Sequence, residues 1–308
     1  MPGRNRPAQR VNHQNHTGNA MIKFNPKKFV AISAALAGVV TGAAGYASPT
    51  VNVDTLTVGI GNNKPWAYKD TDGEIKGINA DIVKAVFQSL GVKKLNFVVS
   101  DFGSLIPGLL SKRYDVVDSG IVLTPERCKL VEFGDPELSS LDALLVAKGN
   151  PKGIHGFEDV LKNPKITIGG TRGSQQAKNA AAAGVTGDQL QQFQNTESSV
   201  AALTSHRVDG LVFTSGTANA LLERPNLANE IERAKPFKGP TDPKTGEVLV
   251  SYVGAAFSKD NAALRDAFNA KLAELKADGT VQKIAAKYGF TPEEKAPDGL
   301  VSAKICAG

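Results

Sequence analysis

The chain alternates short apolar runs with amphipathic stretches, and the alternation restarts after Pro151. In the first part, the runs over 55–60, 95–99 and 116–121 predict buried strands, and helices are predicted over 80–90, with Asn79 as its cap, and over 104–110. The second part predicts strands over 165–168, 190–193 and 208–213, and helices over 174–183, 198–206, 215–222, 261–276 and 281–288. This order is typical of parallel α/β layers with helices on both faces of each sheet.

A chain of 308 residues exceeds the size at which a single hydrophobic core is usual. We therefore expect two α/β lobes, the first formed by 51–144 together with 252–308 and the second by 148–248. The chain would cross between them near 144–147 and near 250–254, and such a two-segment hinge permits closure around a ligand. In open α/β sheets ligands bind beyond the carboxyl ends of the strands. The loops after Ile60, Ile121, Ile168 and Phe213 should therefore border a cleft.

The formal net charge of +6 is confined to the N-terminal region. Six cationic residues precede Asp54, the first acidic residue, and without them the rest of the chain has no formal net charge: Arg4, Arg6, Arg10, Lys23, Lys27 and Lys28. A body without excess positive charge gives no reason to expect nucleic acid as a partner.

The basic residues at 23–28 precede the apolar run 29–40 and the small residues of 41–47. This order indicates a secretory signal peptide, with a polar extension before Met21 and cleavage after Ala47. The alternative is a membrane anchor, although the run is short for a membrane span and rich in glycine and alanine. We expect a periplasmic protein, with 1–47 removed on export.

Cys128 and Cys306 are the two cysteines of the chain, and both lie in the exported part. In an oxidising compartment such a pair more often forms a disulfide than two free thiols. The bond would join the C-terminal tail to the loop that carries Arg127, whereas the alternative is two unpaired buried thiols.

Three segments together resemble the extracytoplasmic solute-binding proteins that supply amino-acid-type ABC importers, family 3. They are D-F-G-S-L-I-P-G-L-L-S-K-R-Y-D-V-V-D-S-G-I-V-L-T-P-E-R-C (101–128), G-N-N-K-P-W-A-Y (61–68) and A-E-L-K-A-D-G-T-V-Q-K-I-A-A-K-Y-G-F (273–290). The resemblance implies a type II periplasmic-binding-protein fold, with the ligand held in a cleft between two lobes. It further implies a monomer that delivers a small zwitterionic ligand to a permease in the inner membrane.

In this family the arginine of the T-P-E-R segment binds the ligand's carboxylate, and Arg127 takes that place. A guanidinium matches a carboxylate with two parallel hydrogen bonds; the alternative is an exposed loop arginine. Trp66 and Phe102 could offer aromatic faces to a cationic group, although either could instead belong to the core. Ser174 could offer its hydroxyl at the start of a helix, or serve only as the helix cap.

Two positions depart from the pattern of amino-acid binders. Thr214 stands where these proteins usually carry the aspartate that binds the α-ammonium, and Val122 stands where they usually carry a threonine. An ordinary α-amino acid would leave its ammonium without that partner, which is costly in a closed cleft.

Further segments resemble the ectoine and hydroxyectoine binders more closely: F-G-S-L-I-P-G-L (102–109), T-P-E-R-C-K (124–129), K-G-N-P-K (148–152), E-D-V-x-K-N-P (158–164), L-R-D-A-F-N (264–269) and the terminal C-A-G. This resemblance implies an aromatic cage at Trp66, Phe102 and Val122, with Asn63 where those binders have an acid. Valine is not aromatic and asparagine is not charged, so a related zwitterion, or a polar or cationic amino acid, stays open as the ligand.

Asp118 interrupts an apolar strand. Strand alternation puts it on the same side as Gly120, where both could face the cleft and Asp118 could replace the missing acid. The alternative is an exposed strand end.

The sequence predicts no catalytic residues, metal site or cofactor. His13, His16, His155 and His206 lack metal-ligand spacing, and no nucleophile–base pair stands out. A periplasmic dehydratase-like enzyme on the same fold is the alternative, with Asp118 as the one candidate acid.

Overall fold

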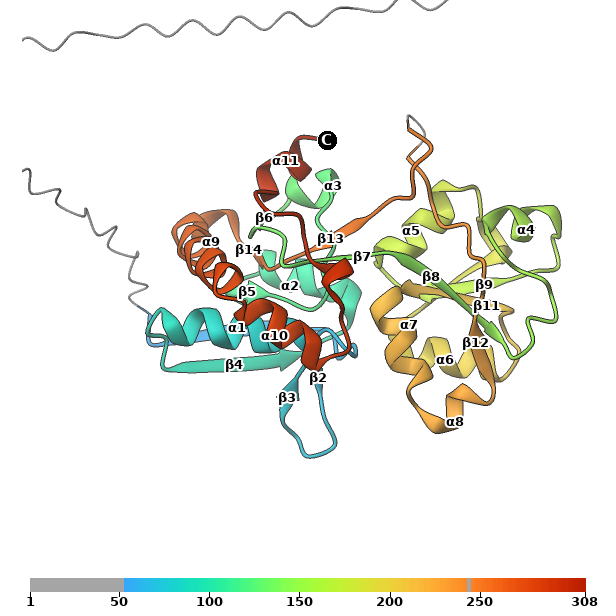
Figure 1. Ribbon diagram of the computed structural model, residues 1–308, viewed down its shortest axis with the longest axis horizontal. Helices are drawn as coiled ribbons and strands as arrows, with labels where there is room; N and C mark the ends of the chain where they lie inside the picture. Colours follow the sequence, from blue (N-terminus) through green and yellow to red (C-terminus); the bar gives the residue numbers. More distant parts are fainter. Residues whose placement is uncertain (1–52, 243–244) are drawn as a thin grey trace, which may run out of the picture. The chain divides into compact units, whose positions relative to one another are not determined.

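The computed structural model describes residues 53–242 and 245–308 (Figure 1). The expected signal peptide lies outside the described residues. None of the helices in the described part of the chain is both long and apolar enough to cross a membrane.

The first lobe is built on a five-stranded sheet in the order β4-β1-β5-β14-β6. Its strands are β1 (Thr55–Ile60), β4 (Lys94–Val99), β5 (Val116–Val117), β6 (Glu132–Phe133) and β14 (Ala256–Phe257). β1 runs parallel to β4 and to β5, whereas β14 is antiparallel to β5 and β6. A small hairpin, β2 (Tyr68–Lys69) with β3 (Ile75–Lys76), extends from this lobe.

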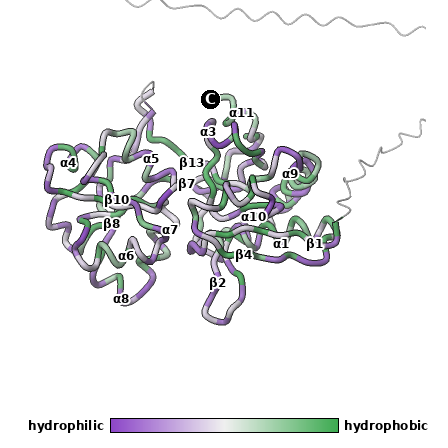
Figure 2. The backbone as a smooth tube through the Cα atoms, turned by 180° about the vertical axis from the view of Figure 1, so that it is seen from behind, coloured by the Kyte–Doolittle hydropathy of each residue, from purple (hydrophilic) through white to green (hydrophobic). Residues whose placement is uncertain are grey.

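Helices cover both faces of this sheet. One core packs α1 (Ile78–Ser89) with α9 (Ala262–Ala277) and α10 (Thr280–Lys287), and it includes Phe87, Phe257 and Phe268. The other lies under α2 (Leu105–Leu110), which follows a 3₁₀ turn at Phe102–Ser104. Hydrophobic and hydrophilic residues alternate along α9 (Figure 2), as expected of a helix buried on one face. The short helices α3 (Pro125–Cys128) and α11 (Ser302–Ala307) and a 3₁₀ turn at Pro292–Glu294 complete the lobe.

The second lobe repeats this plan with a sheet in the order β10-β9-β11-β8-β12. Its strands are β8 (Asp142–Ala147), β9 (Ile168–Thr171), β10 (Leu190–Phe193), β11 (Gly210–Thr214) and β12 (Ile231–Arg233). Its helices are α4 (Phe157–Lys162), α5 (Gln175–Ala182), α6 (Thr196–Thr204), α7 (Ser215–Leu222) and α8 (Pro225–Ala228), with a 3₁₀ turn at Gly187–Gln189. Two apolar cores pack in this lobe, centred on Leu145 and Leu211 in one and on Leu144 and Val212 in the other, because neighbouring strand residues point to opposite faces.

Two antiparallel strands connect the lobes: β7 (Leu138–Ser140) pairs with β13 (Ser251–Val253) (Figure 1). β8 follows β7 into the second sheet, and β14 follows β13 into the first. The chain therefore first passes between the lobes before Asp142, a few residues earlier than the expected 144–147. The second passage was expected at 250–254, and β13 lies within that range.

The two sheets are mixed rather than parallel throughout. β8 and β14 each enter a sheet from the hinge and run against their neighbours, because they start at the edge where the parallel strands end. A pattern of apolar runs does not give strand direction, so the sequence could not predict this reversal.

Three predicted elements differ in the structure. The strand expected over 116–121 ends at Val117, because the chain turns at Gly120, whose φ is +69°. The strand expected over 165–168 is displaced to Ile168–Thr171. Asn79 does not cap α1, which begins after Gly77; its buried side chain instead donates to Glu137 and accepts from the Gly120 backbone.

Candidate functional site

Trp66 forms the floor of a small cavity between the carboxyl ends of the two sheets. It follows the loop after β1, and its side chain is fully buried. A Cβ atom at Gly120 would lie 2.7 Å from the indole ring, so only glycine permits this close contact. Trp66 packs in the core, as the alternative expected, and its ring also lines the cavity, whereas its contact with a ligand stays a prediction.

A network of neutral hydrogen-bonding groups joins Trp66 to the second lobe. The indole Nε1 donates to the hydroxyls of Thr214, at 3.2 Å, and Thr217, at 3.1 Å. Asn63 Oδ1 accepts from the hydroxyls of Thr196, at 3.2 Å, and Thr217, at 3.5 Å. Thr214 also caps α7, so these contacts fix the start of that helix against the first lobe.

Five residues of the first lobe line the cavity: Gly61, Asn63, Trp66, Phe102 and Gly120. Eight come from the second lobe: Thr171, Ser174, Gln176, Asn195, Thr196, Phe213, Thr214 and Thr217. The wall so described holds three aromatic rings and no carboxylate. The space open to the centres of water molecules is about 30 Å³, so the lobes are nearly closed over it.

Arg127 lies beside this cavity rather than in its wall. Its side chain is buried, with 5 % of the residue exposed, and burial lowers the guanidinium pKa to about 10. Nη1 donates to the Val122 carbonyl at 2.6 Å, and Nη2 donates across the lobes to the Gly173 carbonyl at 2.9 Å. The described residues give this guanidinium no carboxylate partner within ion-pair distance. It is a buried cation held by two neutral carbonyl groups, so the alternative of an exposed loop arginine is wrong.

Gln176 connects the cavity to a buried acid. Its Nε2 donates to Asp142 Oδ1 at 2.9 Å, and Asn179 Nδ2 donates to the other carboxyl oxygen at 2.7 Å. Burial raises the Asp142 pKa, and the two amide hydrogen bonds only partly oppose that rise. Since the amide nitrogen of Gln176 is turned to Asp142, its Oε1 is the atom available to accept a hydrogen bond from a ligand.

Asp118 does not lie in the cavity wall. It is fully buried and faces Glu137, which is also buried. Neither expectation for this residue holds, because β5 ends at Val117 and strand alternation no longer determines where Asp118 points. Val122 likewise packs in the core and contributes its carbonyl to Arg127, not a side chain to the cavity.

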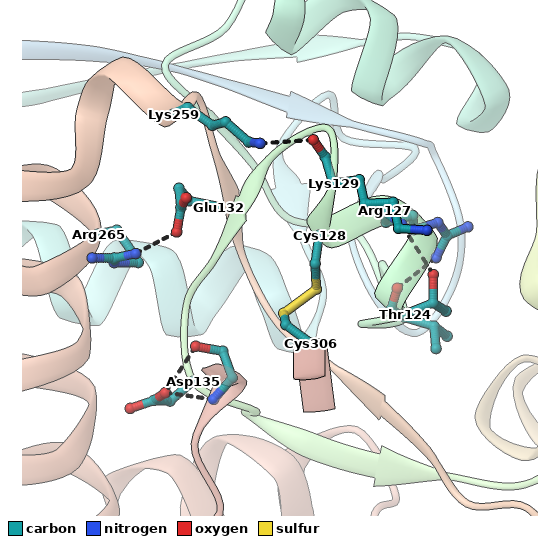
Figure 3. The surroundings of a disulfide bond; sticks show 11 residues. Thr124, Arg127, Cys128, Lys129, Glu132, Asp135, Lys259, Arg265 and Cys306 are labelled. Atoms are coloured by element: carbon teal, nitrogen blue, oxygen red, sulfur yellow. Dashed lines mark hydrogen bonds and ion pairs between the residues drawn. A yellow bond between two sulfur atoms is a disulfide. The ribbon is translucent and has the colours of Figure 1, made fainter. Parts of the chain in front are cut away.

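Cys128 and Cys306 form a disulfide between α3 and α11, with an S–S distance of 2.05 Å (Figure 3). Cys128 follows Arg127 in the same short helix, which Thr124 caps by accepting from the Arg127 backbone N–H. The figure shows Cys128 directed to Cys306 and Arg127 directed to the other side of α3. The bond therefore holds the helix that carries the arginine.

Sequence reasoning missed most of the residues contributed by the second lobe. Of the residues predicted to bind ligand, Asn63, Trp66, Phe102, Gly120, Ser174 and Thr214 line the cavity, whereas Arg127, Val122 and Asp118 do not. Phe213 ends the strand expected over 208–213, Thr171 lies in the loop expected after Ile168, and Thr217 follows Thr214 at helix-capping spacing, so each carried a usable signal. Asn195 is a residue type that caps helices and it caps α6, so it carried a signal too, whereas Gln176 and Thr196 carried none. In the described part of the chain, no three acidic, histidine or cysteine side chains gather where they could hold a metal ion.

Two mixed α/β lobes joined by paired hinge strands, with a polar cavity between them, define the type II periplasmic-binding-protein fold. The family of bacterial extracellular solute-binding proteins, family 3, matches residues 56–291. The chain belongs to this family.

Relatives of known or assigned role agree with this membership. The chain is 34 % identical over 292 residues to a probable amino-acid ABC transporter periplasmic-binding protein, y4tE, of Sinorhizobium fredii (strain NBRC 101917 / NGR234), covering 90 % of this chain and 92 % of the relative. It is 28 % identical to the lysine/arginine/ornithine-binding periplasmic protein of Escherichia coli K12, over 85 % of this chain and 96 % of that protein.

Solved structures include EhuB in complex with hydroxyectoine, which is 32 % identical with a TM-score of 0.75 and covers 83 % of this chain and 95 % of that one. The ancestral amino acid-binding protein AncCDT-1, described as a precursor of cyclohexadienyl dehydratase, is 29 % identical with a TM-score of 0.66, over 76 % and 95 % of the two chains. The chain is thus similar to binding proteins and to one precursor of an enzyme.

Proposed function

We propose that this protein captures a small zwitterion, of the ectoine or hydroxyectoine type, in the periplasm and delivers it to the permease of an ABC importer. The observation that carries the proposal is the composition of the cavity wall. Trp66, Phe102 and Phe213 supply aromatic surface, the remaining side chains are neutral, and the buried cation Arg127 lies beside them.

The ligand's carboxylate would bind Arg127. In the closed arrangement the Gly173 carbonyl accepts a hydrogen bond from Nη2, one of the two terminal guanidinium nitrogens. A small opening of the lobes would replace this neutral acceptor with a carboxylate, whose hydrogen bond to a guanidinium is stronger. Ser174, which lies next to Gly173 at the start of α5, would offer its hydroxyl to the same carboxylate.

The ligand's cation would be delocalised rather than a compact ammonium. An ammonium concentrates its charge and requires acceptors of matching charge when buried, and the described wall offers only neutral oxygens. A delocalised cation can lie against Trp66 and Phe102 and share its N–H groups with neutral acceptors such as Gln176 Oε1. Asp142, behind Gln176, orients that amide by accepting from its nitrogen.

The amino-acid alternative rests on the relatives, one of which is named for binding lysine, arginine and ornithine. It requires the neutral network of Asn63, Thr196 and Thr217 to accept a full ammonium. The dehydratase alternative requires an acid in the cavity, and its candidate, Asp118, faces Glu137 instead.

Thermal unfolding of the exported chain, freed of co-purified ligand, tests the proposal against ectoine, hydroxyectoine, other betaines and a panel of amino acids. A ligand at ~100 times its dissociation constant should add about 2.7 kcal/mol to the unfolding free energy and raise Tm by several degrees. Arg127→Lys should reduce the shift to about a third or less of the wild-type value, whereas Arg172→Lys, at a neighbouring exposed arginine, should retain it. A shift with amino acids alone would reject the delocalised cation, and no shift with any compound would reject both assignments.

A further inference from the structure

A second cavity lies in the first lobe, between α10, the segment that follows it and the hinge strand β7. It offers about 310 Å³ to the centres of water molecules, roughly ten times the space in the cleft. Ligand pockets are on the order of 300–1,000 Å³ and are mainly apolar with a few polar groups. This one, called the C-terminal cavity below, is walled chiefly by Leu138, Val281, Ala285, Ala286, Phe290 and Pro292.

Positively charged residues outnumber negatively charged ones in the wall of the C-terminal cavity. Three lysines border it: Lys276, Lys283 and Lys295. The acid in its wall is Glu137, whose carboxyl group is buried against Asp118 and Asn79. Lys295 pairs with Asp298 at 2.8 Å, and Lys276 donates to the Pro136 carbonyl.

Lys276 and Lys283 differ in exposure, but neither forms an ion pair with another described residue. Asp135, Glu137 and Asp298 act on Lys276 from beyond ion-pair distance, and Asp278 acts on Lys283 in the same way. Burial lowers the Lys276 pKa in spite of these acids. An anion at the mouth of the cavity would stabilise both cations.

We propose that the C-terminal cavity is a second binding site, which takes a small amphipathic anion with its apolar part among Leu138, Val281 and Phe290 and its charged group at Lys276 and Lys283. The space fits an aliphatic or aromatic chain of modest length. The excess of lysine over accessible acid selects an anion over a cation of the same shape.

Phe290 links this cavity to the ligand cleft. Its ring packs edge-on against Trp66, with centroids 5.2 Å apart, and a Cβ at Gly216 of α7 would lie only 2.7 Å from it. One residue thus touches the C-terminal cavity, the floor of the cleft and the second lobe. Leu138, in the same wall, belongs to the hinge strand β7. An anion in the cavity should therefore change lobe closure; this coupling rests on the proposed function, whereas binding in the cavity does not.

The first experiment titrates the exported chain with 8-anilinonaphthalene-1-sulfonate, a fluorescent apolar anion, and then displaces it with octanoate or octylammonium. We expect saturable binding, displacement by octanoate, and at least tenfold weaker displacement by octylammonium. Because Ala286 is exposed at the cavity wall, Ala286→Phe should block binding without loss of folding, checked by Tm. Lys283→Gln should weaken octanoate binding about twofold to fivefold, and Lys152→Gln, an exposed lysine of the second lobe, should not.

Binding that is absent, that survives Ala286→Phe unchanged, or that prefers octylammonium would overturn the proposal. The coupling has its own readout, since Trp66 is the one tryptophan in the chain. Octanoate should change its emission in wild type but not in Ala286→Phe. Unchanged emission with octanoate bound would refute the link to the cleft and leave the assignment of the cleft ligand untouched.

Discussion

Asp118 and Glu137 lie face to face in the interior of the first lobe, both almost without exposure to solvent. Asn79 donates to one Glu137 oxygen at 2.6 Å, and the positive charge of Lys276 also acts on Glu137. Two buried carboxyl groups in contact cannot both ionise at low cost, so the pair holds a proton. Burial and mutual repulsion raise the Asp118 pKa well above its usual range, and burial raises that of Glu137 to about 7.

The first prediction is that stability falls as pH rises toward neutrality. An acid whose pKa is raised by folding contributes stability that is full below its unfolded pKa, near 4.5 for Glu137, and is lost as pH rises through about 7. The unfolding free energy should fall by about 3 kcal/mol over this pH range. Glu137→Gln removes this titrating group and keeps an acceptor for Asn79, so it should flatten this part of the dependence. Chemical denaturation between pH 4 and 8 measures it, with Asp188→Asn, an exposed acid of the second lobe, as control; identical slopes for wild type and Glu137→Gln would contradict it.

The second prediction concerns the arginine beside the cleft. Arg127→Lys removes the planar fork that reaches both Val122 and Gly173, and a lysine cannot reproduce two parallel hydrogen bonds. Affinity for the cleft ligand should fall by about 2–3 kcal/mol, or roughly 30- to 150-fold. Calorimetric titration with the ligand found by the unfolding panel measures this loss. A loss of less than threefold would show that Arg127 supports the lobe interface and not the ligand.

Local structure followed from the sequence wherever one segment determined it. The strands Thr55–Ile60 and Leu190–Phe193 and the helix Ser215–Leu222 were predicted with their bounds, because apolar runs and capping residues mark both ends. β5 was predicted too long, since the turn at Gly120 is imposed by its packing against Trp66, a residue more than fifty positions earlier. Such long-range contacts leave no mark in a local pattern.

The candidate site likewise contains residues that local sequence patterns predict and residues whose positions depend on long-range contacts. Trp66, Asn63 and Thr214 stand in recognisable segments, and the structure brings them together through hydrogen bonds to the Thr217 hydroxyl. Gln176 could not be predicted, because the position of its side chain in α5 depends on Asp142 of β8, which lies 34 positions earlier in the chain. A buried acid that orients a site residue by accepting a hydrogen bond from its amide leaves no motif in the sequence.

The third prediction concerns the effect of the neutral Asn63 side chain on which ligand the cavity prefers. Asn63→Asp keeps the shape of the side chain and its acceptor for Thr196 and Thr217, but adds a negative charge. Ligands with a compact ammonium should gain affinity about tenfold or more, because hydrogen bonds to charged groups contribute roughly 1.5–3 kcal/mol. Titration with ectoine and with lysine, compared between Asn63→Asp and the adjacent exposed Asn62→Asp, gives the change in preference. Equal changes in both variants would assign the effect to general charge and reject a specific role for Asn63.

The fourth prediction separates the disulfide's contribution to stability from its effect on binding. The bond joins residues 178 positions apart, so its removal frees a large loop in the unfolded chain. The paired change of Cys128→Ser and Cys306→Ser should lower the unfolding free energy by about 2–4 kcal/mol. Arg127 would lose the anchor of its short helix but keep its cap from Thr124 and both carbonyl partners. Affinity for the cleft ligand should therefore change less than threefold, measured well below the lowered Tm. If affinity fell as far as in Arg127→Lys while the protein stayed folded, the disulfide would be required to position the arginine, and the cap and the two carbonyl contacts would not suffice.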